Sequence, residues 1–511
     1  MSDEGRAGGG RRIWIFRGLG LAAALLVWGA LYGAEGLSAD GRMVAAIGAL
    51  MAVWWTTEAV PLSVTSLLPI VLLPAGTERT VKAATAAYGS SIVFLFLGGF
   101  LLAIAMERHE LHRRIALHVL DRVGVSPRRI VLGMMVATGF LSMWVSNTAT
   151  TLMMLPIGLS VLGLVVERAH GKGTAEELEA KLEEGTIAEA VDDPQVRAFG
   201  ICMTLAIAWS ASMGGLGTLL GSPPNAIVAG YARDELGIDI GFLEWMAVGV
   251  PLAATFIVLA WLLMTRVLYR FTLSDIPGGR KMIREQIDAL GPMGRAEKSV
   301  ALVFGGAAAL WVLPGLLSGI PGLSGIDIFD DTAIAIGAGV ALFFLTDAEG
   351  APLLDWKVAE AQLPWGVLLL FGGGLSLAGS VASTGLDAWF GSQVAGLGAL
   401  PLSLLVASVV AIILFLTEVT SNTATAATFI PVLGGVAAGI DVAPLTLLVP
   451  AAFAATCAFM LPVGTPPNAI VYGTGNVTIA QMVRGGLVLN LLGVVLITAA
   501  FLTVGSLVFG A

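Results

Sequence analysis

Two short polar motifs each occur twice in an otherwise apolar sequence. The motif SNTATTLMMLP at 146–156 matches SNTATAATFIP at 421–431 in six of eleven positions. The motif GSPPNAIVAG at 221–230 matches GTPPNAIVYG at 464–473 in eight of ten positions. Hydroxyl, carboxamide and backbone carbonyl oxygens are the ligands that hard cations prefer. The repeated motifs therefore predict a duplicated binding site for cations.

The paired prolines of the second motif predict a broken helix and, beside it, an anion site. Each proline removes an amide donor and disfavours helix at the preceding residue. Non-helical backbone at membrane depth is tolerated only where it is buried or lines a cavity. Half-helix N-termini attract anions, and none of the four motifs contains Lys or Arg. We therefore expect an anion held by hydroxyls, amides and helix N-termini, with bound cations supplying the positive charge.

A single SNT motif would have a simpler explanation. Ser, Thr and Gly also mediate the packing of helices in membranes. Two copies, each paired with a helix-breaking PPN and placed in inverted halves, favour binding over packing.

The composition requires a membrane around these motifs. The 511 residues are 57% hydrophobic and 12% charged, with a mean hydropathy of +0.89. Soluble proteins carry about 25% charged residues, so a soluble enzyme is excluded. Runs of roughly 20 apolar residues predict an all-α polytopic membrane protein with about eleven transmembrane helices. The runs lie near 13–32, 43–57, 62–76, 88–106, 198–230, 242–268, 299–318, 331–346, 364–382, 443–473 and 481–509.

Two further apolar segments, 130–165 and 403–438, predict re-entrant helical hairpins with an SNT motif at each tip. The arms of the first, near 130–145 and 152–165, would reach roughly 24 Å and 21 Å, short of the approximately 30 Å hydrocarbon core. Polar residues in the middle of a span would be costly facing lipid. A hairpin that enters and leaves from one side resolves both problems.

The spacing of the motifs indicates a duplicated fold. Ser146 and Ser222 are 76 residues apart, whereas Ser421 and Thr465 are 44 apart. The difference of 32 is almost the length of a charged insert at 167–197, which we expect to be a solvated cytoplasmic helix and loop.

The distribution of Lys and Arg predicts the orientation in the membrane. These residues concentrate in the N-terminal arm and in two clusters, 108–129 and 266–298, and only Lys357 and Arg484 follow. The loop 383–402, beside the second hairpin, has neither and maps outside. We therefore expect a multi-pass protein of the cytoplasmic membrane with its N-terminus in the cytoplasm, its C-terminus outside and its repeats inverted. Inverted repeats that meet near the midplane are typical of secondary transporters.

Other reactive residues offer little. Cys202 and Cys457 lie in apolar runs, and the four histidines have no metal-binding spacing. Glu58 and Glu418 are intramembrane or interfacial carboxylates. A structural role near the helix breaks is favoured for them, and a role in carrying a coupling proton remains open.

At these motifs the sequence resembles the divalent anion/sodium symporter (DASS) family, which includes bacterial dicarboxylate transporters and animal sodium-coupled di- and tricarboxylate carriers. The resemblance covers nearly the whole chain from about residue 40. It implies an inverted-repeat, elevator-type secondary transporter with eleven transmembrane helices, two re-entrant hairpins and two discontinuous helices. It also implies a homodimer in which a scaffold holds the interface and a transport domain moves.

The resemblance implies a domain division along both repeats. The scaffold helices are 1–126 and 299–398, the transport parts are 127–270 and 399–511, and 271–298 is a cytoplasmic linker. Within the transport parts lie the hairpins 127–166 and 400–440 and the broken helices 198–235 and 443–473.

The resemblance also implies binding residues at the hairpin tips and helix breaks. Substrate would be bound by Ser146, Asn147, Thr148, Ser222, Pro223, Ser421, Asn422, Thr423, Thr465 and Pro466. One sodium site would use Ser142, Ser146, Asn147 and Gly221. The other would use Thr417, Thr420, Asn422 and Gly464, with Thr420 contributing its carbonyl.

The expected function is sodium-coupled transport of C4-dicarboxylates of the succinate, malate and fumarate type, with Na⁺ as the coupling ion and no nucleic-acid partner. A dicarboxylate exchanger and a sodium-coupled citrate or sulfate carrier remain alternatives. The twin SNT motifs argue against a channel, a pump subunit or an arsenite-type permease. A membrane-embedded enzyme is disfavoured because no nucleophile–base pair or metal motif lies in the spans.

Overall fold

The computed structural model describes residues 3–124, 126–170, 193–273, 279–317 and 330–510. Within these ranges the regular structure is helical, apart from one isolated bridge between Thr346 and Pro352. Seven of the described helices are long and apolar enough to cross a membrane, and five shorter apolar helices accompany them. The predicted all-α polytopic architecture is confirmed.

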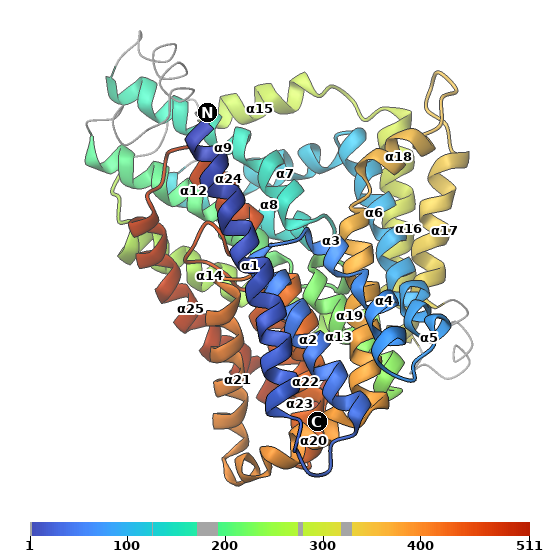
Figure 1. Cartoon of the computed structure of the whole chain (residues 1–511). Helices are drawn as coiled ribbons and strands as arrows, with labels where there is room; N and C mark the ends of the chain where they lie inside the picture. The colour runs from blue at the N-terminus through green and yellow to red at the C-terminus, as the bar shows by residue number, and fades with distance from the viewer. Residues whose placement is uncertain (1–2, 125, 171–192, 274–278, 318–329, 511) are drawn as a thin grey trace.

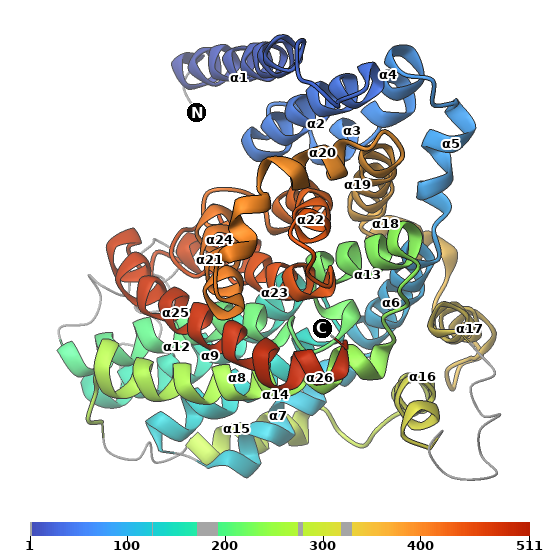
Figure 2. The same cartoon turned by 90° about the horizontal axis from the view of Figure 1, so that it is seen from below.

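Seven helices precede the first hairpin (Figure 1). They are α1 (Asp3–Ala30), α2 (Ala39–Thr57), α3 (Leu62–Thr65), α4 (Leu68–Gly76), α5 (Val81–Ala86), α6 (Ser91–Arg108) and α7 (Leu111–Val123). The apolar run at 62–76, which we expected to be a single span, divides between α3 and α4. Helix α1 packs along α2 at the edge of the molecule, as Figure 2 shows from below.

The first hairpin and the first broken helix follow. They comprise α8 (Pro127–Ser142), α9 (Asn147–His170), α12 (Pro194–Gly214), the short 3₁₀ turn η2 (Leu219–Gly221) and α13 (Pro223–Leu236), and α14 (Phe242–Leu263) comes after them. The prediction that the second hairpin arm begins near 152 is wrong. Helix α9 begins at Asn147, directly after Ser146, because the tip turns within four residues. Most of the charged insert, 171–192, lies outside the described residues.

The second half begins with α15 (Gly279–Ala289) in the linker. Then come α16 (Arg295–Leu317), α17 (Asp331–Phe344), α18 (Trp356–Gln362), α19 (Trp365–Ser383) and α20 (Leu386–Gln393). The second hairpin is α21 (Leu402–Thr417) and α22 (Asn422–Gly439), and the second broken helix is α23 (Leu445–Thr456) and α24 (Pro466–Gly473). Helices α25 (Ile479–Ala500) and α26 (Ser506–Val508) end the chain.

The two hairpins enter from opposite ends of the molecule (Figure 1). Helices α8 and α9 lie toward the end that carries α7, α15 and the N-terminus, whereas α21 and α22 lie toward the end that carries α20 and the C-terminus. The halves also interlock, because α17 packs along α6, α9 contacts α24, and α13 contacts α22. Each hairpin therefore meets the broken helix of the other repeat.

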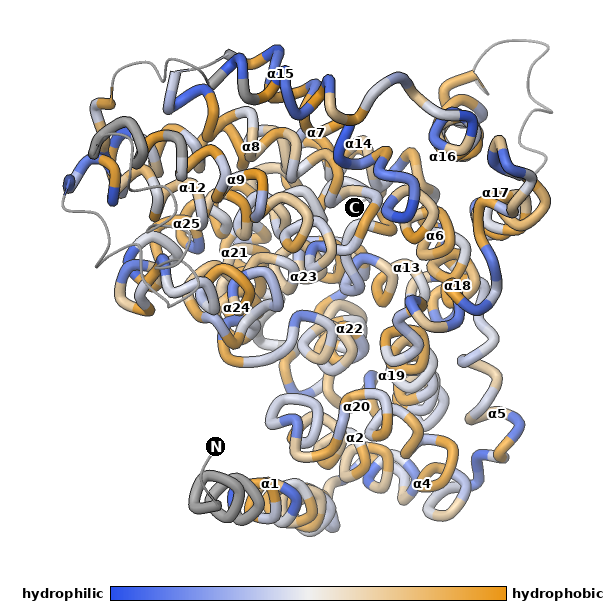
Figure 3. The backbone as a smooth tube through the Cα atoms, turned by 90° about the horizontal axis from the view of Figure 1, so that it is seen from above, coloured by the Kyte–Doolittle hydropathy of each residue, from blue (hydrophilic) through white to orange (hydrophobic). Residues whose placement is uncertain are grey.

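The outer surface is apolar, as a membrane requires. Leu302, Leu313 and Leu316 of α16 and Leu25 and Leu26 of α1 are exposed. Hydrophilic residues instead gather on α15 at the N-terminal end, which Figure 3 shows from above. Among the seven described helices long enough to cross a membrane, α12 is the most enclosed, with 89% of its most apolar stretch buried. Helix α12 thus forms the centre on which the first hairpin packs.

Candidate functional site

The first hairpin tip gathers oxygens from four elements around Asn147. Ser142, the last residue of α8, donates from Oγ to Oδ1 of Asn147 at 2.6 Å. The same carboxamide position lies 3.1 Å from the carbonyl oxygen of Ala211 and 3.2 Å from that of Gly221. An oxygen at this position faces two carbonyl oxygens, which a cation among them would stabilise, whereas an amide nitrogen would donate to both. The donor set is made of neutral oxygens and fits a sodium ion.

Three of the four residues predicted for this sodium site are in mutual contact. The fourth, Ser146, is exposed, and its Oγ accepts a hydrogen bond from the Ala149 amide at 3.2 Å. Its hydroxyl therefore caps α9. The carbonyl of Ala211 was not predicted. This carbonyl also accepts a hydrogen bond from the Gly215 amide at 3.0 Å, and no residue pattern in the sequence marks it as a ligand.

The second hairpin tip repeats this arrangement. Thr417 Oγ1 lies 2.8 Å from Asn422 Oδ1 and 3.0 Å from the carbonyl oxygen of Ala455. The threonine and asparagine are five residues apart, as are Ser142 and Asn147. Both carboxamide oxygens thus turn toward the hydroxyl at the end of the preceding helix. At the first tip, an amide nitrogen in this position would instead donate to Ser142 Oγ and to the Ala211 and Gly221 carbonyls, so an oxygen there requires a bound cation.

The other two residues predicted for the second sodium site flank this cluster. Thr420 Oγ1 donates to the Leu416 carbonyl at 3.0 Å, so its side chain is engaged within the tip. The expectation that its carbonyl serves the ion stays a prediction. Gly464 packs against the tip backbone, because a Cβ at this position would lie 3.1 Å from the Glu418 carbonyl oxygen.

The asparagine of each PPN motif holds the break of its helix together. Asn225 Nδ2 donates to two backbone carbonyls, seven and ten residues earlier, both at 2.8 Å. Asn468 Nδ2 makes the same two bonds, both at 3.0 Å. Sequence reasoning missed this role, although the repeated motif was the signal that could have found it.

The two tips meet through the broken helices. Thr456 Oγ1, at the end of α23, donates to Ser222 Oγ at 3.0 Å. Its carbonyl accepts from Asn422 Nδ2 at 3.4 Å, and the neighbouring Gly221 carbonyl faces the Asn147 carboxamide. The N-termini of α9, α13, α22 and α24 therefore converge on one region. Helix N-termini attract anions, so four of them make this region suited to a negatively charged substrate.

The predicted substrate residues differ in exposure at this meeting point. Ser222 and Thr465 are buried, and their hydroxyls bond Thr456 Oγ1 and the Asn468 amide respectively. The remaining eight are half-buried or exposed: Ser146, Asn147, Thr148, Pro223, Ser421, Asn422, Thr423 and Pro466. The exposed set comes from both repeats, as a shared binding face requires.

The two carboxylates singled out in the sequence differ sharply. Glu418 is buried and accepts hydrogen bonds from the amides of Phe459, Met460 and Leu461 and from Asn490 Nδ2. These contacts favour the structural interpretation of Glu418. Glu58 is exposed and ends α2 with a left-handed φ of 48°.

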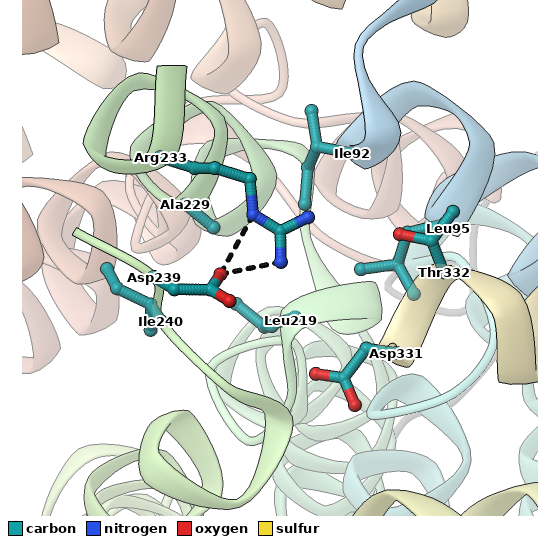
Figure 4. A pocket seen from close by; sticks show the side chains of 9 residues that line it. All are labelled: Ile92, Leu95, Leu219, Ala229, Arg233, Asp239, Ile240, Asp331 and Thr332. Carbon is teal, nitrogen blue, oxygen red and sulfur yellow. Dashed lines mark hydrogen bonds and ion pairs between the residues drawn. The ribbon is translucent and has the colours of Figure 1, made fainter. Parts of the chain in front are cut away.

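A separate polar cluster surrounds Arg233 of α13 (Figure 4). Arg233 donates to Ser91 Oγ of α6 at 2.6 Å and to Asp330 Oδ2, before α17, at 3.2 Å. It also donates to Asp239 Oδ1 at 2.8 Å. Nearby, the Phe242 amide of α14 donates to Asp331 Oδ2 at 2.9 Å. The cluster joins α13 and α14 to α6 and α17.

Among the described residues, His, Cys, Asp and Glu form no group of three that could hold a metal ion. Both cysteines are free and fully buried.

Two inverted hairpins whose tips meet two broken helices define a class of protein, the inverted-repeat secondary transporters. Residues 14–510 match the family model described as the sodium:sulfate symporter transmembrane region. The chain belongs to this family, and the resemblance noted in its sequence is confirmed.

Relatives share this sequence over most of its length. The sodium-dependent dicarboxylate transporter SdcS of Staphylococcus saprophyticus is 42% identical over 470 residues, which cover 91% of this chain and 86% of the relative. The protein of the same name from Staphylococcus aureus strain USA300 is 42% identical over 473 residues, 92% of this chain and 87% of its own.

Two solved structures share the fold alone. The YdaH transporter of Alcanivorax borkumensis superposes with a TM-score of 0.56 at 16% identity, covering 90% of this chain and 98% of its own. MtrF of Neisseria gonorrhoeae, described as illuminating a class of antimetabolite efflux pumps, gives a TM-score of 0.55 at 14% identity, covering 96% and 93%.

Proposed function

We propose that this chain transports C4-dicarboxylates together with sodium ions across the cytoplasmic membrane. The observation that carries the proposal is the pair of neutral oxygen clusters at the two hairpin tips, beside four converging helix N-termini. Family membership and the names of the SdcS relatives support both the coupling ion and the substrate class.

The two asparagines couple ion and substrate in this proposal. Each carboxamide, at Asn147 and Asn422, turns its oxygen into the cation cluster and donates from its nitrogen to a substrate carboxylate. Asn422 Nδ2 also donates to the Thr456 carbonyl at 3.4 Å, which leaves its second hydrogen for the substrate. None of the tip motifs has a fixed cation. Bound sodium ions therefore supply the positive charge that a dianion needs. Binding of either partner raises the affinity for the other.

The two tips also account for the size of the substrate. Each repeat brings one SNT motif to the shared region, so each motif serves one end of a molecule with two carboxylates. The carboxamide and hydroxyl donors suit the planar oxygens of a carboxylate. Sulfate, citrate and exchange of dicarboxylates are the alternatives that the experiment below separates.

We infer that transport follows an elevator movement in a homodimer. In this division, 1–126 and 299–398 form the scaffold, and 127–270 and 399–511 form the moving part. Several hydrogen bonds between the two parts gather around Arg233, whose partners Ser91 and Asp330 belong to the scaffold. Such exposed polar contacts can break and reform as the parts slide.

We further infer that the end carrying the N-terminus, α7 and α15 faces the cytoplasm. The basic helix α15 supports this, because Lys and Arg favour the cytoplasmic side. An impermeant thiol reagent should label a cysteine placed in 383–402 from outside. A cysteine placed in 170–190 should be labelled only after permeabilisation, and the reverse pattern contradicts the orientation.

Uptake of labelled succinate into proteoliposomes tests the function. We expect uptake to require an inward sodium gradient, with Li⁺ or K⁺ substituting poorly, and to be inhibited by malate and fumarate. Uptake driven by internal succinate without sodium would indicate an exchanger. Stronger inhibition by sulfate or citrate than by malate would reassign the substrate.

A further inference from the structure

One buried carboxylate at the second hairpin tip ties three elements together. The side chain of Glu418 follows α21 and is only 3% exposed. Its Oε1 accepts from the Phe459 amide at 2.7 Å and from Asn490 Nδ2 at 2.7 Å. Its Oε2 accepts from the amides of Met460 at 2.9 Å and Leu461 at 3.1 Å. The carboxylate thus joins the tip to the break between α23 and α24 and to α25.

The backbone at this break needs such a partner. Residues 457–465 are not helical, and their amides lie at membrane depth, where an unpaired donor is costly. An ionised carboxylate only accepts hydrogen bonds, and charge-assisted bonds to backbone amides are strong. Three consecutive amides on one carboxylate therefore fix the direction of this part of the chain.

The fixed segment leads directly to the glycine of the second sodium site. Leu461, whose amide Glu418 holds, accepts through its carbonyl from Asn468 Nδ2 at 3.0 Å and from the Gly464 amide at 3.2 Å. On the other side, the backbone of Glu418 packs against Gly464. Glu418 also immediately follows Thr417, whose hydroxyl belongs to the cation cluster. The carboxylate and the ion ligands therefore share one rigid frame.

The first repeat holds its tip differently. Met143 occupies the position after Ser142 that Glu418 occupies after Thr417. There, Thr218 of the broken helix donates its hydroxyl to the Met143 backbone carbonyl, and no side-chain charge is involved. The carboxylate frame is thus specific to the second repeat.

We propose that Glu418 is a positioning residue of the second sodium site: it holds the break between α23 and α24 so that Gly464 meets Thr417 and Asn422. The proposal rests on the sodium coupling proposed above. Glu418 itself contacts neither ion nor substrate. Its loss therefore weakens sodium binding at one site, and substrate binding only through that ion.

Glu418→Gln tests this positioning. Glutamine keeps the size of the side chain but places an NH₂ donor among amides that also donate. We expect the sodium concentration for half-maximal succinate uptake to rise about tenfold, because at least one charge-assisted bond is lost. The KM for succinate should rise at low sodium and return to the wild-type value at saturating sodium, with kcat unchanged. A merely structural defect would not be rescued by sodium.

Two further variants keep the test decisive. Glu58→Gln makes the same chemical change at an exposed carboxylate and should leave the sodium dependence unchanged. Asn490→Ala removes one of the four donors and should shift the sodium dependence in the same direction by about threefold, even if Glu418→Gln fails to fold. A sodium-dependent wild type with an unchanged sodium dependence in Glu418→Gln or Asn490→Ala overturns the positioning role. A wild type that needs no sodium instead overturns the proposed function.

Discussion

The two hairpin tips are built alike but are supported by different parts of the molecule. Both pair a terminal hydroxyl with an asparagine five residues later. The first tip is held from outside by aromatic rings. Trp144 lies 6.1 Å from Phe242 and 6.3 Å from Trp311, both nearly parallel to it, and meets Phe304 edge-on at 5.1 Å.

The aromatic rings around Trp144 come from both proposed parts of the chain. Trp311 and Phe304 belong to α16, which lies in the proposed scaffold, whereas Trp144 belongs to the proposed moving part. The second tip rests on Glu418 and its partners in 459–461 and α25, all of which belong to the moving part. A sliding movement would therefore separate Trp144 from Trp311 and Phe304, whereas Phe242 and Thr218 would stay with the first tip. The support of the second tip would move along with it. The proposed ion ligands are alike in the two repeats, whereas their supports differ.

The largest effect on succinate binding should come from the asparagine that each tip contains. Asn147→Ala and Asn422→Ala each remove an oxygen from a cation cluster and a donor from the substrate face. A hydrogen bond to a charged group contributes about 1.5–3 kcal/mol, so succinate affinity should fall roughly 10- to 150-fold in each variant. Calorimetry at several sodium concentrations measures this loss, and the sodium dependence should shift upward with it.

Asn→Asp at either position is the matched control. Aspartate keeps an oxygen for the cation but loses the amide donor and adds a negative charge. Both variants should bind sodium and reject the dianion. Normal succinate transport at low sodium by Asn147→Ala or Asn422→Ala would make that asparagine a packing residue.

A smaller effect should separate the supports of the two tips. Trp144→Ala removes a half-buried ring from the aromatic stack and should lower the free energy of unfolding by about 2 kcal/mol. Val419→Ala, at the second tip, changes a side chain that is 57% exposed and should stay within about 0.5 kcal/mol. Thermal unfolding in one detergent compares them. Equal losses would mean that the tips do not differ in support.

Much of this comparison could be predicted from the sequence, and what could not be predicted has physical reasons. The repeated motifs located both tips and both broken helices, and the ligand pairs Ser142–Asn147 and Thr417–Asn422 meet as predicted. The start of α9 was misplaced because the arm was measured over its apolar residues alone, and the polar residues before them form the first turn of the helix.

What the sequence did not provide depends on contacts between distant segments. The Ala211 oxygen that faces the Asn147 carboxamide belongs to a backbone carbonyl, which any residue type supplies equally. The partners of Glu418 are three backbone amides and Asn490, 72 residues away. The stack around Trp144 joins helices whose relative placement no local pattern encodes. Local repetition thus predicts ligands, and tertiary packing decides what holds them.

A further prediction concerns the hydrogen bonds of Arg233, which join the proposed moving part to the proposed scaffold. Arg233→Gln removes the bonds to Ser91 and Asp330, which cross from the moving part to the scaffold. Because the ion pair between Arg233 and Asp330 is partly exposed, we expect its loss to destabilise this arrangement of the two parts by about 1 kcal/mol. Val463 is exposed and lies in the proposed moving part, so a cysteine placed there reports on the arrangement through its rate of reaction with a thiol reagent. A change of about 1 kcal/mol should alter this rate roughly fivefold. The two native cysteines are buried and should not react with the reagent.

Asp239→Asn provides the control for this contact. Asp239 pairs with Arg233 but belongs to the same part of the chain, so its loss leaves the crossing bonds in place. The reporter at Val463 should then react at the wild-type rate. A similar change in both variants would mean that Arg233 acts within its own part rather than between the parts.

The smallest effect should lie far from both tips and depend on pH. Arg108, at the end of α6, donates to Asp355 at 2.8 Å, and this hydrogen bond, with one from the Val358 amide, lowers the pKa of Asp355. Because the folded pKa lies below the unfolded one, the stabilisation is complete above the ordinary carboxyl value of about 4 and disappears as the pH falls through the lowered value. Arg108→Gln should therefore reduce stability slightly at neutral pH and flatten its loss between neutral and acid pH, as unfolding at a series of pH values would measure. Both residues lie in the proposed scaffold, so neither sodium site should respond. An altered sodium dependence in this variant would show that the tips are coupled to the whole scaffold, and the contrast between their local supports would no longer account for their behaviour.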